Sequence, residues 1–226
     1  MTTLFYIEHN NGKISDQSLK AITATTNIEG DVHGLIVGSN ISDAVTEASK
    51  ISGLNKLLHV DDEAFDNVLA EKLTQVMLNV ANDYDYFLAA ATTTGKNVMP
   101  RLAAKLDVSQ ISEIVSVESA DTFIRTIYAG NAIATVQTTD AKKVLTVRPT
   151  AFKAATTDSA ECEVVNITAE NIPSISEFIG EELTKSDRPE LTSAKTIISG
   201  GRGMQNGENF ELLDKVAEKL GAAVGA

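Results

Sequence analysis

Residues 86–97 read YFLAAATTTGKN, and this stretch decides the fold. Its first six residues are a continuous apolar run, which is typical of a strand buried on both faces. A polar turn rich in threonine follows, and Val98, Met99 and Leu102 then recur at helical spacing. Pro100 is expected in the first turn of this helix, where its missing N–H has no intrahelical use. Such a strand-to-helix unit indicates a parallel sheet with crossover helices.

Earlier segments of the chain repeat this strand-then-helix order. Buried strands are predicted at residues 4–7, 32–37 and 56–60, and each precedes a segment with helical periodicity. The clearest helix follows the third strand, where apolar side chains recur between Leu69 and Val80. The N-terminal part of the chain is therefore predicted to be an α/β domain.

After residue 107 the apolar period changes from helical to two. Four short β-prone runs follow, at residues 114–117, 123–128, 132–136 and 144–147. The connections between them are short, which predicts hairpins of antiparallel strands. A further strand is expected near residues 162–167. The fold class is thus α/β, with a parallel sheet and an antiparallel hairpin extension.

Beyond a polar stretch with Pro173, Asp187 and Pro189 the pattern starts again. A strand at residues 194–199 leads through a glycine turn into a helical stripe, formed by Phe210, Leu213, Val216, Ala217 and Leu220. Residues 222–226 resemble the opening of another strand. We place a domain boundary here, with one domain at 1–187 and the start of a second at 188–226. Since domains below roughly 40 residues rarely fold unaided, we expect this second domain to be incomplete and its apolar stripe to need a cover.

The glycine turn Gly200, Gly201, Arg202 and Gly203 is the main candidate binding site. Backbone N–H groups and a helix dipole between a strand and a helix can hold a phosphate. The spacing is G-x-G-x-x-x-G, not the usual G-x-G-x-x-G, and no acidic residue lies about twenty positions on. A tight turn that needs glycine conformations is the alternative. Arg202 could steer an anion, cap carbonyls or sit in water.

A second candidate lies at residues 92–97, between the decisive strand and its helix. The segment fails as a phosphate-binding P-loop, because Ala90 replaces the first glycine and Asn97 the magnesium-binding Ser or Thr. It can still form a pocket wall, which leaves an adenine-nucleotide-binding module without a redox role as the alternative function. Lys96 and Arg101 are expected on a solvated helix face or at an interface.

Composition and charge exclude several classes of function. Asp and Glu number 31 against 19 Lys and Arg, and residues 188–226 hold five of each sign, so the excess lies before them and argues against a nucleic-acid surface. The acidic face is either a solubility feature or a docking surface. No apolar run is long enough for membrane insertion, and the N-terminus shows no targeting segment. The single cysteine fits a reducing, cytoplasmic compartment.

No metal site or catalytic residue is predicted. The acidic residues 61–63 and Asp66 are better explained by a helix N-terminus than by a metal ion. His9, His33 and His59 lack the spacing of zinc ligands or of a catalytic triad. Cys162 is interpreted as a small strand residue.

Five motifs together strongly resemble the electron transfer flavoprotein alpha-subunit family. They occur in order over essentially the whole chain, at residues 89–106, 146–152, 188–191, 197–203, and 207–210 with 222–226. The resemblance implies an adenine-nucleotide-hydrolase-like first domain that faces a beta subunit and does not hold the flavin. It also implies that a Rossmann-like FAD-binding domain begins at residue 188.

In that family the alpha–beta heterodimer is an electron carrier and not an enzyme. It takes electrons through FAD from acyl-CoA or other dehydrogenases, as in fatty acid beta-oxidation, and passes them to a quinone oxidoreductase. Of the flavin-side scaffold only Gly200, Gly201, Arg202 and Gly203 can be matched here, because the family's later flavin motifs would lie beyond Ala226. We therefore expect this chain alone not to retain FAD.

Overall fold

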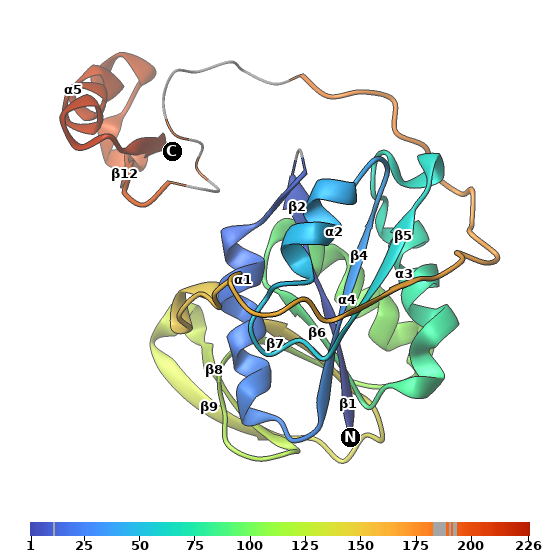
Figure 1. Ribbon diagram of the computed structural model, residues 1–226. Coiled ribbons are helices and arrows are strands. Elements are labelled where there is room, and N and C mark those ends of the chain that lie inside the picture. Colours follow the sequence, from blue (N-terminus) through green and yellow to red (C-terminus); the bar gives the residue numbers. More distant parts are fainter. Residues whose placement is uncertain (11, 183–188, 190, 192–193) are drawn as a thin grey trace. The chain divides into compact units, whose positions relative to one another are not determined.

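The computed structural model describes residues 1–10, 12–182, 189, 191 and 194–226 (Figure 1). These residues fall into two compact units, Met1–Phe178 and Ile179–Ala226. The predicted domain boundary between residues 187 and 188 lies outside the described residues, as does most of the motif at 188–191. Each unit is considered by itself below.

The first unit is built on a sheet that has nine strands among the described residues, in the order β11-β5-β4-β1-β6-β10-β7-β8-β9. The strands are β1 (Thr2–Tyr6), β4 (Asp31–Gly38), β5 (Lys56–Asp61), β6 (Tyr86–Ala90), β7 (Gln110–Val117), β8 (Thr122–Ile127), β9 (Ala132–Gln137), β10 (Lys143–Val147) and β11 (Glu163–Asn166). Strands β11 to β7 in this order are parallel, and β8 and β9 extend the sheet as antiparallel strands. A short hairpin joins β2 (His9–Asn10) to β3 (Lys13–Ile14). The predicted α/β class with an antiparallel extension is confirmed.

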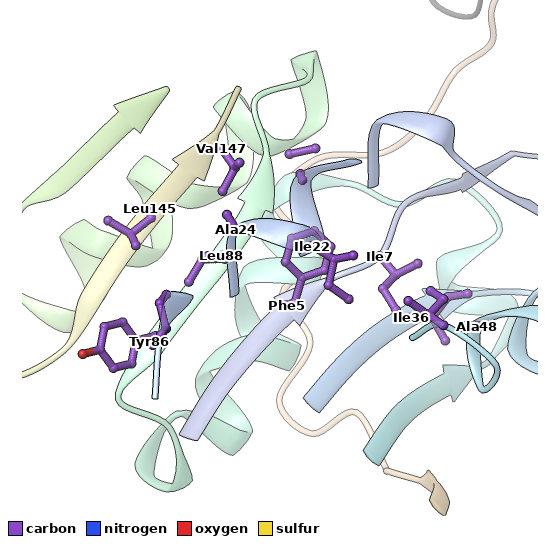
Figure 2. Close-up of a cluster of buried hydrophobic side chains, with 14 of the residues drawn as sticks. Phe5, Ile7, Ile22, Ala24, Ile36, Ala48, Tyr86, Leu88, Leu145 and Val147 are labelled. Atoms are coloured by element: carbon purple, nitrogen blue, oxygen red, sulfur yellow. The ribbon is translucent and has the colours of Figure 1, made fainter. Parts of the chain in front are cut away.

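Helices cover both faces of this sheet. They are α1 (Asp16–Ile22), α2 (Ser42–Ala48), α3 (Ala70–Val80) and α4 (Thr93–Leu106). Helices α1 and α2 pack on one face, where Ile22 and Ala48 lie over strand residues such as Phe5 (Figure 2). Helices α3 and α4 pack on the other face through side chains such as Leu73 and Leu102. Each fully buried aliphatic or aromatic side chain of these layers contributes about 1.5–3 kcal/mol.

The strand order reverses between β1 and β6. From β1 the chain builds β4 and β5 on one side of the sheet and then returns to lay β6 on the other side of β1. Open α/β sheets bind ligands in the crevice at the carboxyl ends of the strands at such a switch point. In this unit the crevice lies between the segment after β1 and the segment after β6.

Two details of the first unit differ from the sequence predictions. Strand β10 is not part of a hairpin: it lies between β6 and β7 and is parallel to both. Four of its five residues are buried, which suits the interior of a parallel sheet better than an edge. Pro100 lies inside α4 and not in its first turn, because the helix already begins at Thr93. The ring removes the hydrogen bond that the carbonyl of Lys96 would accept.

The second unit pairs β12 (Ile197–Ser199) with β13 (Ala223–Gly225) in parallel. Between them lie short 3-10 helices at Arg202–Met204 and Gly207–Phe210, and helix α5 (Glu211–Leu220). This confirms the predicted order of strand, glycine turn, helix and strand (Figure 1). Much of the apolar side of α5 is uncovered, since Val216 is 41% and Leu220 59% exposed. Among the described residues no helix has the length and apolar character needed to cross a bilayer.

Candidate functional site

The glycine loop after β12 is held close to both neighbouring elements. The N–H of Gly200 donates to the carbonyl of Gly225 in β13 (3.0 Å). A Cβ on Gly200 would meet the side chains of Leu213, Met204 and Phe210 at 2.7–2.9 Å. Gly200 therefore lets the end of β12 approach helix α5.

The other glycines of the loop leave free space. A Cβ on Gly201 or Gly203 would have no neighbour within 4 Å. Within residues 194–226, which are described without a gap, the only glycine with a positive φ is Gly221. Glycine conformation thus does not explain Gly201 and Gly203, so the alternative of a turn that needs such conformations is not supported. An incoming group can approach the loop backbone at both positions.

The loop also offers donors and a positive charge. Among the described residues, the N–H groups of Gly201, Arg202 and Gly203 donate no hydrogen bond and Arg202 forms no ion pair. Successive free N–H groups beside a guanidinium suit a phosphate. The loop opens onto a hollow of about 540 Å³. Its lining residues are Gly203, Met204, Gln205, Glu208, Asn209, Glu211, Leu212 and Lys215.

The helix start that follows the loop does not add to this site. The side-chain carbonyl of Asn206 accepts from the N–H groups of Glu208 (3.1 Å) and Asn209 (3.3 Å). Glu208 and Glu211 also place carboxylates in these first turns. An anion there would compete with the cap and meet negative charge. The donors for a phosphate are therefore in the loop itself and not at the helix N-terminus that the sequence indicated.

The second candidate, the segment after β6, is bridged from within. The hydroxyl of Thr92 accepts from the N–H of Gly95 (3.0 Å) and donates to the carboxylate of Glu8, which follows β1. A Cβ on Gly95 would collide with the carbonyl oxygen of Ala90, so the helix start lies against the end of the strand. Burial raises the pKa of Glu8, and the Thr92 hydrogen bond opposes that shift. Glu8 and Thr92 thus span the switch-point crevice.

The cations beside this crevice are also engaged. Glu113 pairs with Lys96 at 2.5 Å and with Arg148 at 2.8 Å. These two hydrogen bonds hold the pKa of Glu113 below its usual range. Lys96 is about half exposed but is not a free surface charge as the sequence predicted, and Arg101 lies 3.8 Å from Glu71.

Neither Glu8 nor Glu113 was singled out from the sequence. Their partners lie 84 residues away in the case of Thr92 and 35 residues away in the case of Arg148. A carboxylate directly after the buried strand at residues 4–7 was the available signal for Glu8, because polar groups that follow parallel strands gather at one edge of the sheet.

The remaining candidates have structural roles. Asp61 accepts from the N–H groups of Asn40 and Ile41, and Asp62 caps the 3-10 helix Glu63–Phe65. Within the described ranges no group of His, Cys, Asp and Glu could hold a metal ion. Burial raises the pKa of the half-buried Cys162 thiol.

Comparisons with known proteins agree on one family. The model of the electron transfer flavoprotein domain matches residues 3–171, and that of the electron transfer flavoprotein FAD-binding domain matches residues 190–226. Electron transfer flavoprotein subunit alpha of Pseudomonas aeruginosa is 49% identical over 226 residues, which cover 100% of this chain and 73% of that protein. The Bradyrhizobium diazoefficiens protein of the same name is 48% identical, with 100% and 72% covered.

A more distant relative carries a similar name. The probable mitochondrial electron transfer flavoprotein subunit alpha of Caenorhabditis elegans is 40% identical over 228 residues, which cover 100% of this chain and 68% of that protein. These matches support the flavoprotein prediction. They give no support to the alternative of a nucleotide-binding module without a redox role.

Proposed function

The chain belongs to the electron transfer flavoprotein alpha-subunit family, and we propose that it acts as an electron carrier and not as an enzyme with a substrate of its own. Its electrons would come from acyl-CoA or other dehydrogenases and pass to a quinone oxidoreductase. The names of the relatives support this proposal. The single cysteine fits a reducing compartment, and we propose the cytoplasm.

The observation that carries the proposal is the open glycine loop after β12. We propose that the free N–H groups of Gly201, Arg202 and Gly203 hold a phosphate of FAD and that the Arg202 guanidinium balances its charge. When bound, FAD would supply the redox chemistry through its isoalloxazine ring. The match of residues 190–226 to the FAD-binding domain supports this assignment.

We propose the beta subunit of an electron transfer flavoprotein as the partner of the first unit. The acidic excess before residue 188 supports a docking role for that part of the chain. Co-purification with a beta subunit tests this role, and the absence of any complex would count against it. The domain division at residues 187 and 188 is also part of the proposal.

Titration with FAD tests the flavin assignment. We expect a polypeptide of residues 1–226 to bind FAD weakly, with a Kd on the order of 0.1 mM, because the described second unit buries few side chains and leaves α5 largely uncovered. Arg202→Ala should weaken this binding about tenfold, whereas the control Lys219→Ala on α5 should not change it. Tight, stoichiometric flavin absorbance from the polypeptide alone would refute weak binding, and an unchanged Kd for Arg202→Ala would refute the role of the loop.

A further inference from the structure

We infer that the switch-point crevice of the first unit is closed by the chain itself, with the carboxylate of Glu8 standing where the anionic group of a ligand would lie. This inference concerns the first unit only and does not depend on the flavin loop of the second unit. It assigns to Glu8 a selectivity role, since the crevice is the position at which open α/β sheets take up their ligands.

The first step is the position of the two bridging side chains. Glu8 lies two residues beyond the end of β1, and Thr92 lies two residues beyond the end of β6. These strands are direct neighbours, with Tyr6 opposite Ala89. The hydrogen bond from the Thr92 hydroxyl to the Glu8 carboxylate therefore crosses the crevice at its opening.

The second step is that both ends of the bridge are fixed. The backbone N–H of Glu8 donates to the hydroxyl of Ser18 (2.9 Å), and its carbonyl accepts from the N–H of Ser15 (2.9 Å), both at the start of α1. The Thr92 hydroxyl is held by the N–H of Gly95. Because the main chain of Glu8 is anchored, its carboxylate cannot leave the crevice without a change in side-chain conformation or loss of these bonds.

The third step is electrostatic. The start of α4 carries the partial positive charge that attracts anions, and Glu8 places its carboxylate on the residue that caps this start. The neighbouring cations Lys96 and Arg148 are paired with Glu113. Both features that would attract a phosphate are thus used by internal carboxylates. A phosphate-bearing ligand would have to displace Glu8 or lie against its negative charge.

Removal of the Glu8 carboxylate should open the crevice to anions. We propose to measure binding of inorganic phosphate and of AMP to the full chain and to Glu8→Ala by calorimetry, together with the shift in Tm that each ligand produces. For Glu8→Ala we expect at least a tenfold gain in affinity for AMP and a Tm that rises with phosphate. The isosteric Glu8→Gln keeps the crevice filled and should show neither gain.

Glu47→Ala is the matched control, because Glu47 also accepts a backbone N–H, that of Ile14, but is not in the crevice. An equal gain for Glu47→Ala would mean that only net charge matters and would overturn the inference. Folded Glu8→Ala that binds both ligands no better than the unmodified chain would also overturn it, as would tight AMP binding by the unmodified chain. If Glu8→Ala does not fold, Glu8→Ser, whose hydroxyl can still accept from Thr92, is measured with the same criteria. FAD binding at residues 200–203 is recorded in parallel, so that failure of that assignment is seen separately.

Discussion

The turn from β6 to α4 and the turn from β12 to α5 share one local design but differ in what fills them. In both, a buried or paired strand passes through a glycine-containing loop into a helix. In the first, the neighbouring strand β1 leads to Glu8, whose carboxylate occupies the turn. In the second, the neighbouring strand β13 ends in Gly225, which has no side chain to place there. A strand-to-helix turn therefore becomes a binding site or a closed structural joint according to the residue that the adjacent strand delivers.

The largest expected effect that separates the two turns is steric. Gly95→Ala places a Cβ against the carbonyl oxygen of Ala90, which cannot move without shifting the strand. We expect a loss of about 3 kcal/mol in the free energy of unfolding, which outweighs the usual gain of about 1 kcal/mol from alanine in a helix. Gly203→Ala meets no atom and should stay within about 0.5 kcal/mol. Chemical denaturation measures both, and equal effects would remove the distinction between the turns.

The next effect concerns the bridge itself. Thr92→Val removes the cap of α4 and leaves the largely buried Glu8 carboxylate without its donor. We expect a loss of about 2 kcal/mol in the free energy of unfolding. Thr92→Ser keeps both hydrogen bonds and should lose less than half of that amount. If serine proves as damaging as valine, the methyl group and not the hydroxyl stabilises the turn.

A smaller effect is expected in the second unit. Gly200→Ala meets only the outer parts of the Leu213, Met204 and Phe210 side chains, which can move aside. We expect a loss of about 1 kcal/mol in the local stability of α5, seen as faster hydrogen exchange of its amides. Gly207→Ala has open space around the new Cβ and serves as the control. Unchanged exchange in Gly200→Ala would show that β12 and α5 are not closely packed.

The smallest effect is a pair of opposite pH dependences. The pKa of Glu8 is raised in the folded chain, so folding takes up protons and its contribution to stability falls as pH rises from about 4.3 toward the raised value. The pKa of Glu113 is lowered, so its contribution is present above about pH 4.3 and is lost as pH falls through the lowered value. Glu8→Gln should flatten the first dependence and Glu113→Gln the second. Denaturation midpoints between pH 3 and 7 measure both, and slopes of the same sign would contradict these assignments.

Much of the architecture could be predicted from local patterns. The strand-then-helix order, the hairpin of β8 and β9 and the restart at β12 all follow from periodicity, because each is encoded in neighbouring residues. The position of β10 could not, since a short connection to β9 suggested a hairpin while its continuous burial placed it in the interior of the sheet. The start of α4 was also misjudged, because Thr92 caps the helix earlier than Pro100 suggested.

The candidate sites were predicted less completely than the fold. The loop at residues 200–203 was found because its glycines are contiguous in sequence. Glu8 and Glu113 were missed because their roles arise from contacts between distant segments, which only the strand order brings together. The helix N-terminus after the loop was overvalued, since the competing Asn206 cap is a local hydrogen bond that the glycine spacing does not reveal.

The insertion of β10 between β6 and β7 has a consequence for biosynthesis. The ribosome releases β7, β8 and β9 before β10, yet β7 meets the parallel sheet only through β10. Until Val147 has emerged, the nascent chain therefore exposes the hydrogen-bonding edge of β6 and a detached meander. Such unpaired edges invite association with other chains, so we expect chaperones to engage the polypeptide mainly in this interval of its synthesis.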